Sequence, residues 1–252
     1  TAIFASQPID YRNVIKTAYY QSSDTKLSWS EITAYFSKDY EEFLTLFEGK
    51  TAIISLSHDQ QDGAQYKDYI RLKTNGLNES LYSKKNIEVL PKYEALLGLL
   101  PFSFHRDPKK AFVIGFGGGY SVDYLTSVGV EHVHVAELEE GIIEAAQYVF
   151  QGQNPILKRS NLHLEIEDAR YVLAAKMHGP FDIIVSQPSH SWLSGVANLF
   201  TRDFFEIVRG NLAPKGIFSQ WLYLYNMYQV VLKSILHTFY EVFPYGAVFT
   251  ND

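Results

Sequence analysis

The stretch of residues 110–137 constrains the fold more than any other part of the chain. A short apolar run without alternation, residues 111–114, is typical of a strand that is buried on both faces. A glycine-rich turn, residues 115–119, follows it, and helical spacing of apolar side chains comes next. A second apolar run, residues 133–136, closes on Glu137. The order strand, glycine turn, helix, strand and acid predicts one half of a nucleotide-binding α/β sheet.

The glycine turn and the acid indicate what kind of ligand such a sheet would bind. Glycines let the backbone bend tightly and let a ligand lie against it, and the helix behind them offers free N–H groups. Glu137 lies about 20 residues after the first glycine, where a carboxylate can bind both ribose hydroxyls. The spacing is Gly-x-Gly-x-Gly, because residue 120 is Tyr. It favours a nucleoside with a sulfonium and an amino acid tail over a dinucleotide; the alternative is a turn that only joins strand to helix.

Composition excludes several classes of function. The 252 residues carry a formal net charge of −6, and no basic stripe is visible that could neutralise phosphates, so we expect no nucleic acid partner. The chain has no Cys, which excludes disulfides and thiolate catalysis. No apolar stretch reaches the ~18 residues of a membrane span, and no signal peptide is visible. Because the first residue is Thr1, we expect a processed or excised piece of a longer chain.

Three parts are predicted along the chain. Residues 1–42 are a polar, tyrosine-rich, helical lead-in to which we assign no chemistry. Residues 43–90 contain strand-like runs separated by turn signals, including Asn75-Gly76, and predict a small antiparallel β domain of three or four strands. Residues 91–252 alternate between helical and strand patterns and predict a Rossmann-like nucleoside-binding domain. The predicted fold class is therefore α/β, a Rossmann-like S-adenosylmethionine-dependent transferase sheet preceded by a small antiparallel β sheet.

Polar residues gather where the predicted parallel strands end. Beyond the first two strands, we expect strands at 162–166, 181–185, 217–222 and 245–249, and helices at 91–104, 140–150, 169–177, 201–212 and 227–239. A loop is expected at 186–198 and a turn at 214–216. Ligands of such sheets bind beyond the carboxyl ends of the strands. The last strand would be the first arm of an antiparallel hairpin whose second arm is missing, so we expect a truncated piece or one completed by something else.

Three stretches give the chain from about residue 43 to 252 a resemblance to a known family. They are Phe-Val-Ile-Gly-Phe-Gly-Gly-Gly (112–119) with Val-His-Val-Ala-Glu (133–137), Glu-Asp-Ala-Arg (167–170), and Asn-Leu-Phe-Thr (198–201) with Leu-Ala-Pro-Lys-Gly-Ile-Phe-Ser-Gln-Trp (212–221). These resemble the spermidine synthase (polyamine aminopropyltransferase) family, closest to the bacterial branch often fused to membrane segments. The resemblance implies polyamine biosynthesis, with decarboxylated S-adenosylmethionine as donor and co-substrate, a small amine or polyamine acceptor, and a homodimer. We expect a cytoplasmic location, with a membrane tether if the parent chain is membrane-fused.

The chain also departs from this family at acidic positions. The family carries an Asp after the third glycine of its turn, a place that looks like Gly118 here. Its fourth strand ends in an Asp-Ser-x-Asp-Pro-like run whose first Asp is the proposed base, and here that run is 186–190, Ser-Gln-Pro-Ser-His. An attacking amine must lose a proton, and carboxylates both hold a diamine and take that proton. The nucleoside half of the site therefore looks intact, and the polyamine half looks altered.

The candidate site residues follow from these positions. The nucleoside-binding candidates are Gly115, Phe116, Gly117, Gly118, Gly119, Glu137, Leu138, Glu167, Asp168, Ala169 and Ser186. The candidates for binding the acceptor are Gln187, Trp192, Tyr223 and Tyr225, and those for catalysis are His190 and Ser186. Helix capping by Asp168 and a plain surface position for His190 are the open alternatives. No metal ligand set is predicted, because the other histidines lack metal-ligand spacing and those at 132 and 134 are expected to face helices.

Three functions fit these residues. The first is aminopropyl or other alkyl transfer to an amine, as the resemblance implies. The second is S-adenosylmethionine-dependent methyl transfer, which needs no acid to bind an aminopropyl group. The third is a non-catalytic nucleoside-binding domain, favoured by the replacement of acids at Gly118 and Ser186.

Overall fold

The structure is a computed structural model, and it describes most of the chain after residue 40, namely residues 41–59, 69–83, 92–188, 195–224 and 227–250. The chain divides into two compact units. Unit 1 comprises residues 1–89 and 139–153, and unit 2 comprises residues 90–138 and 154–252. The helical lead-in predicted for residues 1–42 lies almost wholly outside the described residues, and the predicted domain boundaries stay predictions.

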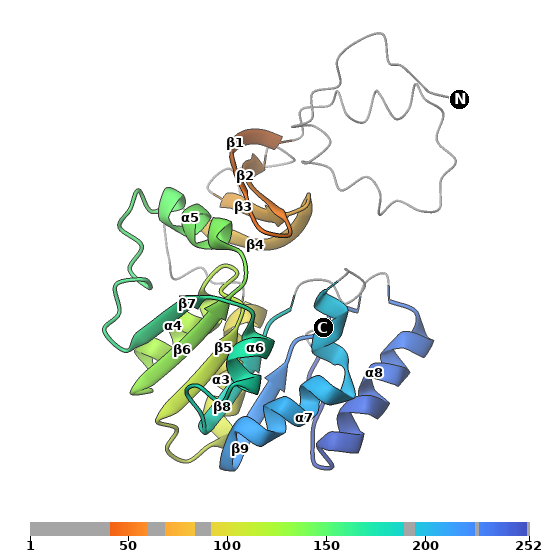
Figure 1. The fold of residues 1–252 in the computed structure, drawn as a ribbon. Helices are drawn as coiled ribbons and strands as arrows, with labels where there is room; N and C mark the ends of the chain where they lie inside the picture. The colour runs from red at the N-terminus through yellow and green to blue at the C-terminus, as the bar shows by residue number, and fades with distance from the viewer. Residues whose placement is uncertain (1–40, 60–68, 84–91, 189–194, 225–226, 251–252) are drawn as a thin grey trace, which may run out of the picture. The chain divides into compact units, whose positions relative to one another are not determined.

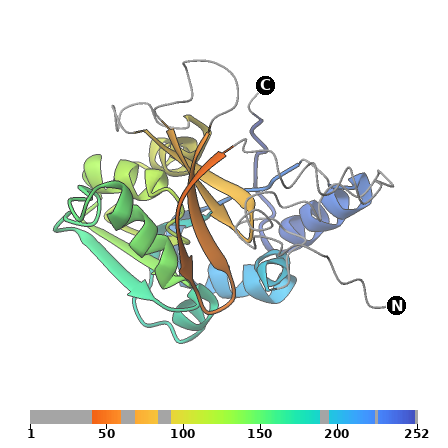
Figure 2. The same ribbon diagram turned by 90° about the horizontal axis from the view of Figure 1, so that it is seen from above.

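Unit 1 contains a four-stranded antiparallel sheet, which confirms the predicted small sheet. Its strands pair in chain order, as Figure 2 shows in orange to gold: β1 (Glu41–Glu48), β2 (Ile53–Asp59), β3 (Tyr69–Thr74) and β4 (Leu77–Ser83). The turn between β3 and β4 has φ values of 49° at Asn75 and 79° at Gly76. Both are in the left-handed region that a two-residue hairpin requires, so the Asn-Gly signal sets the register.

Helix α5 (Glu140–Val149) also belongs to unit 1 and packs on β1 and β2. The residue before it, Glu139, is 6% exposed and accepts hydrogen bonds from the backbone N–H groups of Lys50 (2.7 Å) and Thr51 (2.9 Å). A Cβ added to Gly49 would lie 1.9 Å from the Glu139 carboxylate. The turn between β1 and β2 is therefore fixed by a carboxylate distant in sequence.

Unit 2 is built on a five-stranded parallel sheet with helices on both faces (Figure 1). In the order β7-β6-β5-β8-β9, its strands are β7 (Leu162–Ile166), β6 (His132–Glu137), β5 (Lys110–Ile114), β8 (Phe181–Ser186) and β9 (Leu212–Gln220). The chain runs outward from β5 through β6 to β7, and then returns to the other side of β5 for β8 and β9. The strand order thus reverses beside β5, as expected for a sheet that binds a ligand at its carboxyl edge.

The helices of unit 2 form two layers. Helices α3 (Lys92–Phe104) and α4 (Tyr120–Ser127) pack together on one face of the sheet. Helices α6 (Ala169–Ala174) and α7 (Arg202–Asn211) cover the other, and α8 (Gln229–Val242) packs against α7 (Figure 1). Among the described residues, no helix combines the length and the apolar character needed to cross a membrane.

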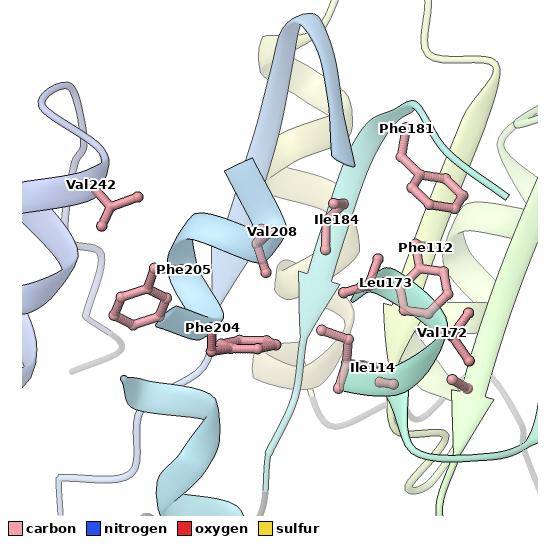
Figure 3. Close-up of a cluster of buried hydrophobic side chains, with 12 residues drawn as sticks. Phe112, Ile114, Val172, Leu173, Phe181, Ile184, Phe204, Phe205, Val208 and Val242 are labelled. Carbon is pink, nitrogen blue, oxygen red and sulfur yellow. The ribbon is translucent and has the colours of Figure 1, made fainter. Parts of the chain in front are cut away.

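The core between the sheet and α6 and α7 combines four phenylalanines with aliphatic side chains (Figure 3). The rings of Phe112 on β5 and Phe181 on β8 have centroids 5.1 Å apart. Phe204 and Phe205 of α7 are both 0% exposed. Each large apolar side chain buried in this way stabilises the fold by ~1.5–3 kcal/mol. This core therefore stabilises the sheet whose strands form the candidate site at their carboxyl ends.

The structure corrects the prediction in several places. The sixth strand predicted at 245–249 is wrong: these residues form no strand, and Tyr245 is 94% exposed. A strand needs a partner for its backbone groups, and apolar alternation cannot supply one. Second, α6 ends at Ala174 rather than at residue 177. Third, the predicted loop at 186–198 ends in a 3₁₀ helix, η2 (Val196–Phe200).

The turn predicted at 214–216 is an interruption within β9 rather than a boundary before it. The register jumps between the pairs Phe181–Leu212 and Ile183–Ile217, so extra residues of β9 loop out opposite β8. Lys215 adopts a φ of 69° in this bulge. Beyond it β9 pairs with β8 again up to Gln220, which brings that residue to the carboxyl edge of the sheet.

Candidate functional site

The glycine turn after β5 needs glycine for both conformation and space. Gly115, Gly117 and Gly119 have φ values of +84°, +53° and +84°, all in the left-handed region that other residues avoid. A Cβ at Gly119 would lie 2.9 Å from Ile156 Cδ1 and 2.9 Å from Phe116 Cζ. The buried Phe116 ring thus lies directly beneath the turn, where it supports the backbone and leaves no room for a side chain at Gly119.

Glu137 ends β6 and is hydrogen-bonded to this turn. Its Oε2 accepts a hydrogen bond of 2.7 Å from the Phe116 N–H, and the side chain is 7% exposed. The neighbouring Gly115 N–H donates to the Ala136 carbonyl at 2.9 Å. The carboxylate that the sequence assigns to a ribose therefore lies against the glycine turn. A buried charge held by a backbone N–H is fixed in position before any ligand arrives.

The acidic pair after β7 lies at the same edge. Asp168 caps α6, because its Oδ1 accepts from the Arg170 N–H at 2.8 Å. Glu167 Oε1 in turn accepts from the Asp168 N–H at 2.8 Å, and the Glu167 N–H donates to the Glu137 carbonyl at 2.9 Å. Both acidic side chains are exposed, whereas Ala169 is buried. The capping alternative for Asp168 is therefore present in the structure, and it leaves the other oxygen of the carboxylate for a second role.

The ends of β8 and β9 carry buried polar atoms that lack partners. Ser186 is 0% exposed, and among the described residues its Oγ has no hydrogen-bond partner. Gln220, its register partner on β9, has a buried Oε1 that likewise finds no donor in the described part of the chain. An unpaired buried oxygen costs ~1–3 kcal/mol, and two of them side by side mark a place where a ligand could bind. The sequence offered Gln220 only as part of a family motif.

Gln187 lies between the glycine turn and the start of α4. Its Oε1 accepts from Ser121 Oγ at 3.3 Å, and its Nε2 lies 3.7 Å from the point where a Cβ of Gly117 would be. Tyr223 follows β9 and contacts Trp221 edge-on, with ring centroids 5.5 Å apart. Leu138 is 39% exposed beyond β6.

Three predicted residues, His190, Trp192 and Tyr225, lie outside the described residues. The rest of the predicted site belongs to unit 2 and occupies the carboxyl ends of β5, β6, β7 and β8, or follows β9. We call the part formed by residues 115–119, 137, 167–168, 186–187 and 220 the carboxyl rim. Which of these residues touch a ligand stays a prediction.

A second polar group, which the sequence did not predict, lies on the α6 face of the sheet. His132 and His134 of β6, His163 and Glu165 of β7, and His178 after α6 form what we call the histidine cluster. The ring of His134 stacks on that of His163 (4.7 Å) and on that of His178 (4.6 Å). His132 and His134 thus face other histidines rather than the expected helices. Burial, followed by the positive charges of His178, His163, Lys110 and His132, lowers the pKa of His134 to about 4.

The comparisons with known proteins agree with this architecture. The family model of the spermine/spermidine synthase domain matches residues 90–250. A spermidine synthase from Dictyostelium discoideum is 26% identical over 64% of this chain and 60% of its own length. Putrescine N-methyltransferase 4 from Nicotiana tabacum is 25% identical over 83% of this chain and 54% of its own length. The chain thus spans little more than half the length of these relatives.

Solved structures show the same fold. A crystal structure of spermidine synthase in complex with the transition state analogue AdoDATO matches with a TM-score of 0.63 and 19% sequence identity. The match covers 81% of this chain and 64% of that one. A small antiparallel sheet followed by a five-stranded parallel sheet matches this fold over the covered residues, which confirms the predicted fold class. Because the family model covers well over half of the residues, this chain belongs to the spermine/spermidine synthase family.

Proposed function

We propose that this chain transfers an aminopropyl group from decarboxylated S-adenosylmethionine to a small amine or polyamine. One observation carries the proposal: within the family domain, the Glu137 carboxylate is held by the Phe116 N–H against a turn with three left-handed glycines. A nucleoside can lie against such a turn, and the carboxylate can bind its ribose hydroxyls.

The reaction mainly requires that the amine and the sulfonium donor be aligned. The nitrogen lone pair of the amine attacks the carbon next to the sulfonium, a C–N bond forms as the C–S bond breaks, and methylthioadenosine leaves as a neutral thioether. The amine must reach the site uncharged or lose its proton to a base. Holding the two reactants in line supplies most of the acceleration, because the leaving group needs no further activation.

The donor would be held by the nucleoside-binding candidates of the carboxyl rim. Glu137 would bind the ribose, and the backbone of residues 115–119 would lie along the donor. Asp168 would accept a hydrogen bond from the adenine amino group while it caps α6, with Glu167, Leu138 and Ala169 beside it. Ser186 Oγ has no hydrogen-bond partner among the described residues, which supports a ligand at the end of β8, and we add Gln220 Oε1 to the set for the same reason.

The acceptor half of the site is built from neutral groups in the described part of the chain. We propose that Gln187 and Tyr223 hydrogen-bond the acceptor, that Trp192 and Tyr225 also contribute to acceptor binding, and that His190 is the base. By the family resemblance, Ser186 and Gly118 occupy positions where the family carries acids. We therefore expect this site to attract a dication more weakly. An acceptor with one ammonium group, or one with a longer apolar part, therefore fits better than a short diamine. The expected homodimer and membrane-fused parent chain stay predictions of the family resemblance.

Calorimetry followed by a turnover assay tests the proposal. Binding of decarboxylated S-adenosylmethionine, S-adenosylmethionine and methylthioadenosine would be measured, and the two donors would then be incubated with putrescine, spermidine and a monoamine. We expect tighter binding of the decarboxylated donor and release of methylthioadenosine with an aminopropylated product. Preference for the carboxylated donor with a methylated product would replace the proposal by methyl transfer. Tight binding of methylthioadenosine without turnover of any pair would leave a non-catalytic nucleoside-binding domain.

A further inference from the structure

The histidine cluster brings together three metal-ligating side chains from segments far apart in sequence. His134 lies on β6, Glu165 on β7 and His178 in the segment between α6 and β8. One potential ligand atom from each of them lies within 4.8 Å of the other two. Spacing along the chain cannot show such a group, because 31 residues separate the first two members and 13 the last two.

Two atoms of this group are buried without a hydrogen-bond partner. His134 Nδ1 and Glu165 Oε1 find none among the described residues. His178 Nε2 lies 2.8 Å from Glu165 Oε1, an ion-pair distance, but the two are not aligned as a hydrogen bond. A carboxylate oxygen can only accept, so its partner must be a donor or a cation, and the ion-pair contact with His178 is the one it has here. A bound cation would satisfy both the oxygen and an imidazole lone pair of His134.

We infer that His134, Glu165 and His178 form a binding site for a divalent transition metal of the zinc class. Two imidazoles and one carboxylate are a ligand set that suits Zn²⁺, with a fourth position open to water. Imidazole ligands also disfavour Mg²⁺ and Ca²⁺, which prefer oxygen. The three side chains are partly rather than fully buried, so an ion can enter from solvent.

Binding of Zn²⁺ would require a small rearrangement of the three side chains. Neighbouring ligand atoms of a tetrahedral zinc lie about 3.4 Å apart. A pair at the 4.8 Å limit would have to close by about 1.4 Å, and the 2.8 Å pair of His178 and Glu165 must open slightly. His134 and His178 are stacked, so one ring must turn for both to aim at a shared ion. The Lys110 charge, which acts on His134, opposes any cation and sets a limit on affinity.

The site is separate from the proposed nucleoside site. His134 lies three residues before Glu137 along β6, which is about 10 Å of strand. None of the three proposed ligands is a candidate of the carboxyl rim. The inference does not rest on the proposed function, and either can fail without the other.

Metal binding to the full chain, stripped with a chelator, tests the site. Equilibrium dialysis against ZnCl₂ with elemental analysis gives the stoichiometry, and Co²⁺ as a probe reports geometry through its visible absorption. We expect one equivalent of Zn²⁺ and a Co²⁺ spectrum of tetrahedral intensity. Glu165→Gln, which keeps shape and removes charge, and His178→Ala should each weaken Zn²⁺ binding at least tenfold.

His237 provides a matched control. It lies 3.4 Å from Glu241 on the exposed side of α8, a histidine and carboxylate pair without a third ligand. His237→Ala should leave Zn²⁺ affinity unchanged, and Lys110→Met should raise it. Circular dichroism on the metal-free variants would confirm that each is folded. Binding of no Zn²⁺ at millimolar concentration, or binding that survives both Glu165→Gln and His178→Ala in folded protein, would overturn the inference.

Discussion

The carboxyl rim and the histidine cluster belong to one parallel sheet, but their polar groups are satisfied differently. At the rim, backbone N–H groups hold the carboxylates: Phe116 donates to Glu137, and Arg170 donates to Asp168. In the histidine cluster, rings stack on one another, and buried atoms of His134 and Glu165 have no hydrogen-bond partner among the described residues. The backbone of the fold orders the carboxylates of the rim by itself. The buried atoms of the cluster, like Ser186 Oγ and Gln220 Oε1 at the rim, have no hydrogen-bond partner in the described part of the chain and are left to be completed by protons, an ion or a ligand.

The difference is one of position along the strands. Rim residues lie at strand ends or just after them, where turns and helix N-termini expose unpaired N–H groups that bind carboxylates. Except for His178, the residues of the cluster lie within β6 and β7, whose backbones pair with each other in the sheet. Side chains there must satisfy each other, and like-charged imidazoles do so poorly.

A substitution at Gly119 should disrupt the preorganised backbone of the glycine turn in the rim. Gly119→Ala should lower the free energy of unfolding by about 2–4 kcal/mol, because the new Cβ meets Phe116 and Ile156 and the residue keeps a left-handed φ. Gly129→Ala is the matched control, since its φ of +98° is also left-handed but nothing lies within 4 Å of its Cβ. It should cost about 1–2 kcal/mol. Equal losses in urea unfolding of the two variants would show that the turn is not packed as described.

Two substitutions separate the two roles of Asp168. Asp168→Ala should cost ~1 kcal/mol of stability, because the first turn of α6 loses its cap. Asp168→Ser keeps a capping oxygen and should cost no more than about 0.5 kcal/mol. If the carboxylate also binds adenine, both variants bind methylthioadenosine more weakly in calorimetry. Wild-type affinity in the Ser variant would make Asp168 a cap alone.

The histidine cluster should make the free energy of unfolding depend on pH through the lowered pKa of His134. The pKa of His134 is about 4 in the folded chain against 6.5 for an ordinary histidine, so between these values the unfolded chain binds more protons. The free energy of unfolding should therefore fall as the pH is lowered from about 6.5 to about 4. The facing groups are His132, His163, His178, Lys110 and Glu165.

His134→Gln should flatten this pH dependence, measured by urea unfolding with a chelator present. A variant whose unfolding free energy follows the wild-type pH curve would mean that His134 is protonated as easily in the folded chain as in the unfolded one. The electrostatic difference between the histidine cluster and the carboxyl rim would then be absent.

The smallest expected change in stability is at Ser186. Its buried hydroxyl has no partner among the described residues, so Ser186→Ala should leave stability unchanged or raise it slightly. If the hydroxyl serves a ligand, donor affinity falls while stability does not. A clear loss of stability, seen as a lower thermal midpoint, would show that the hydroxyl already has a structural role.

The rim could be predicted from the sequence because its signals are local. A buried strand followed by glycines or an acid places those residues at the carboxyl edge wherever the strand falls in the sheet, as Gly115 and Glu137 show. The pairing of Ser186 with Gln220 depends on a bulge in β9, which no local pattern reveals. The histidine cluster depends on the register of β6 against β7 and on where the segment after α6 returns. Contacts of this kind exist only in the folded chain.

The proposed function depends most directly on a nucleoside bound by Glu137. Calorimetric titration of methylthioadenosine into the wild type, Glu137→Gln and Glu137→Ala measures this. Glu137→Ala should weaken binding by ~1.5–3 kcal/mol, or roughly 10- to 150-fold, the scale of charge-assisted hydrogen bonds. Glu137→Gln, which can still accept from the Phe116 N–H, should fall in between. Equal affinity for all three folded proteins would contradict the account.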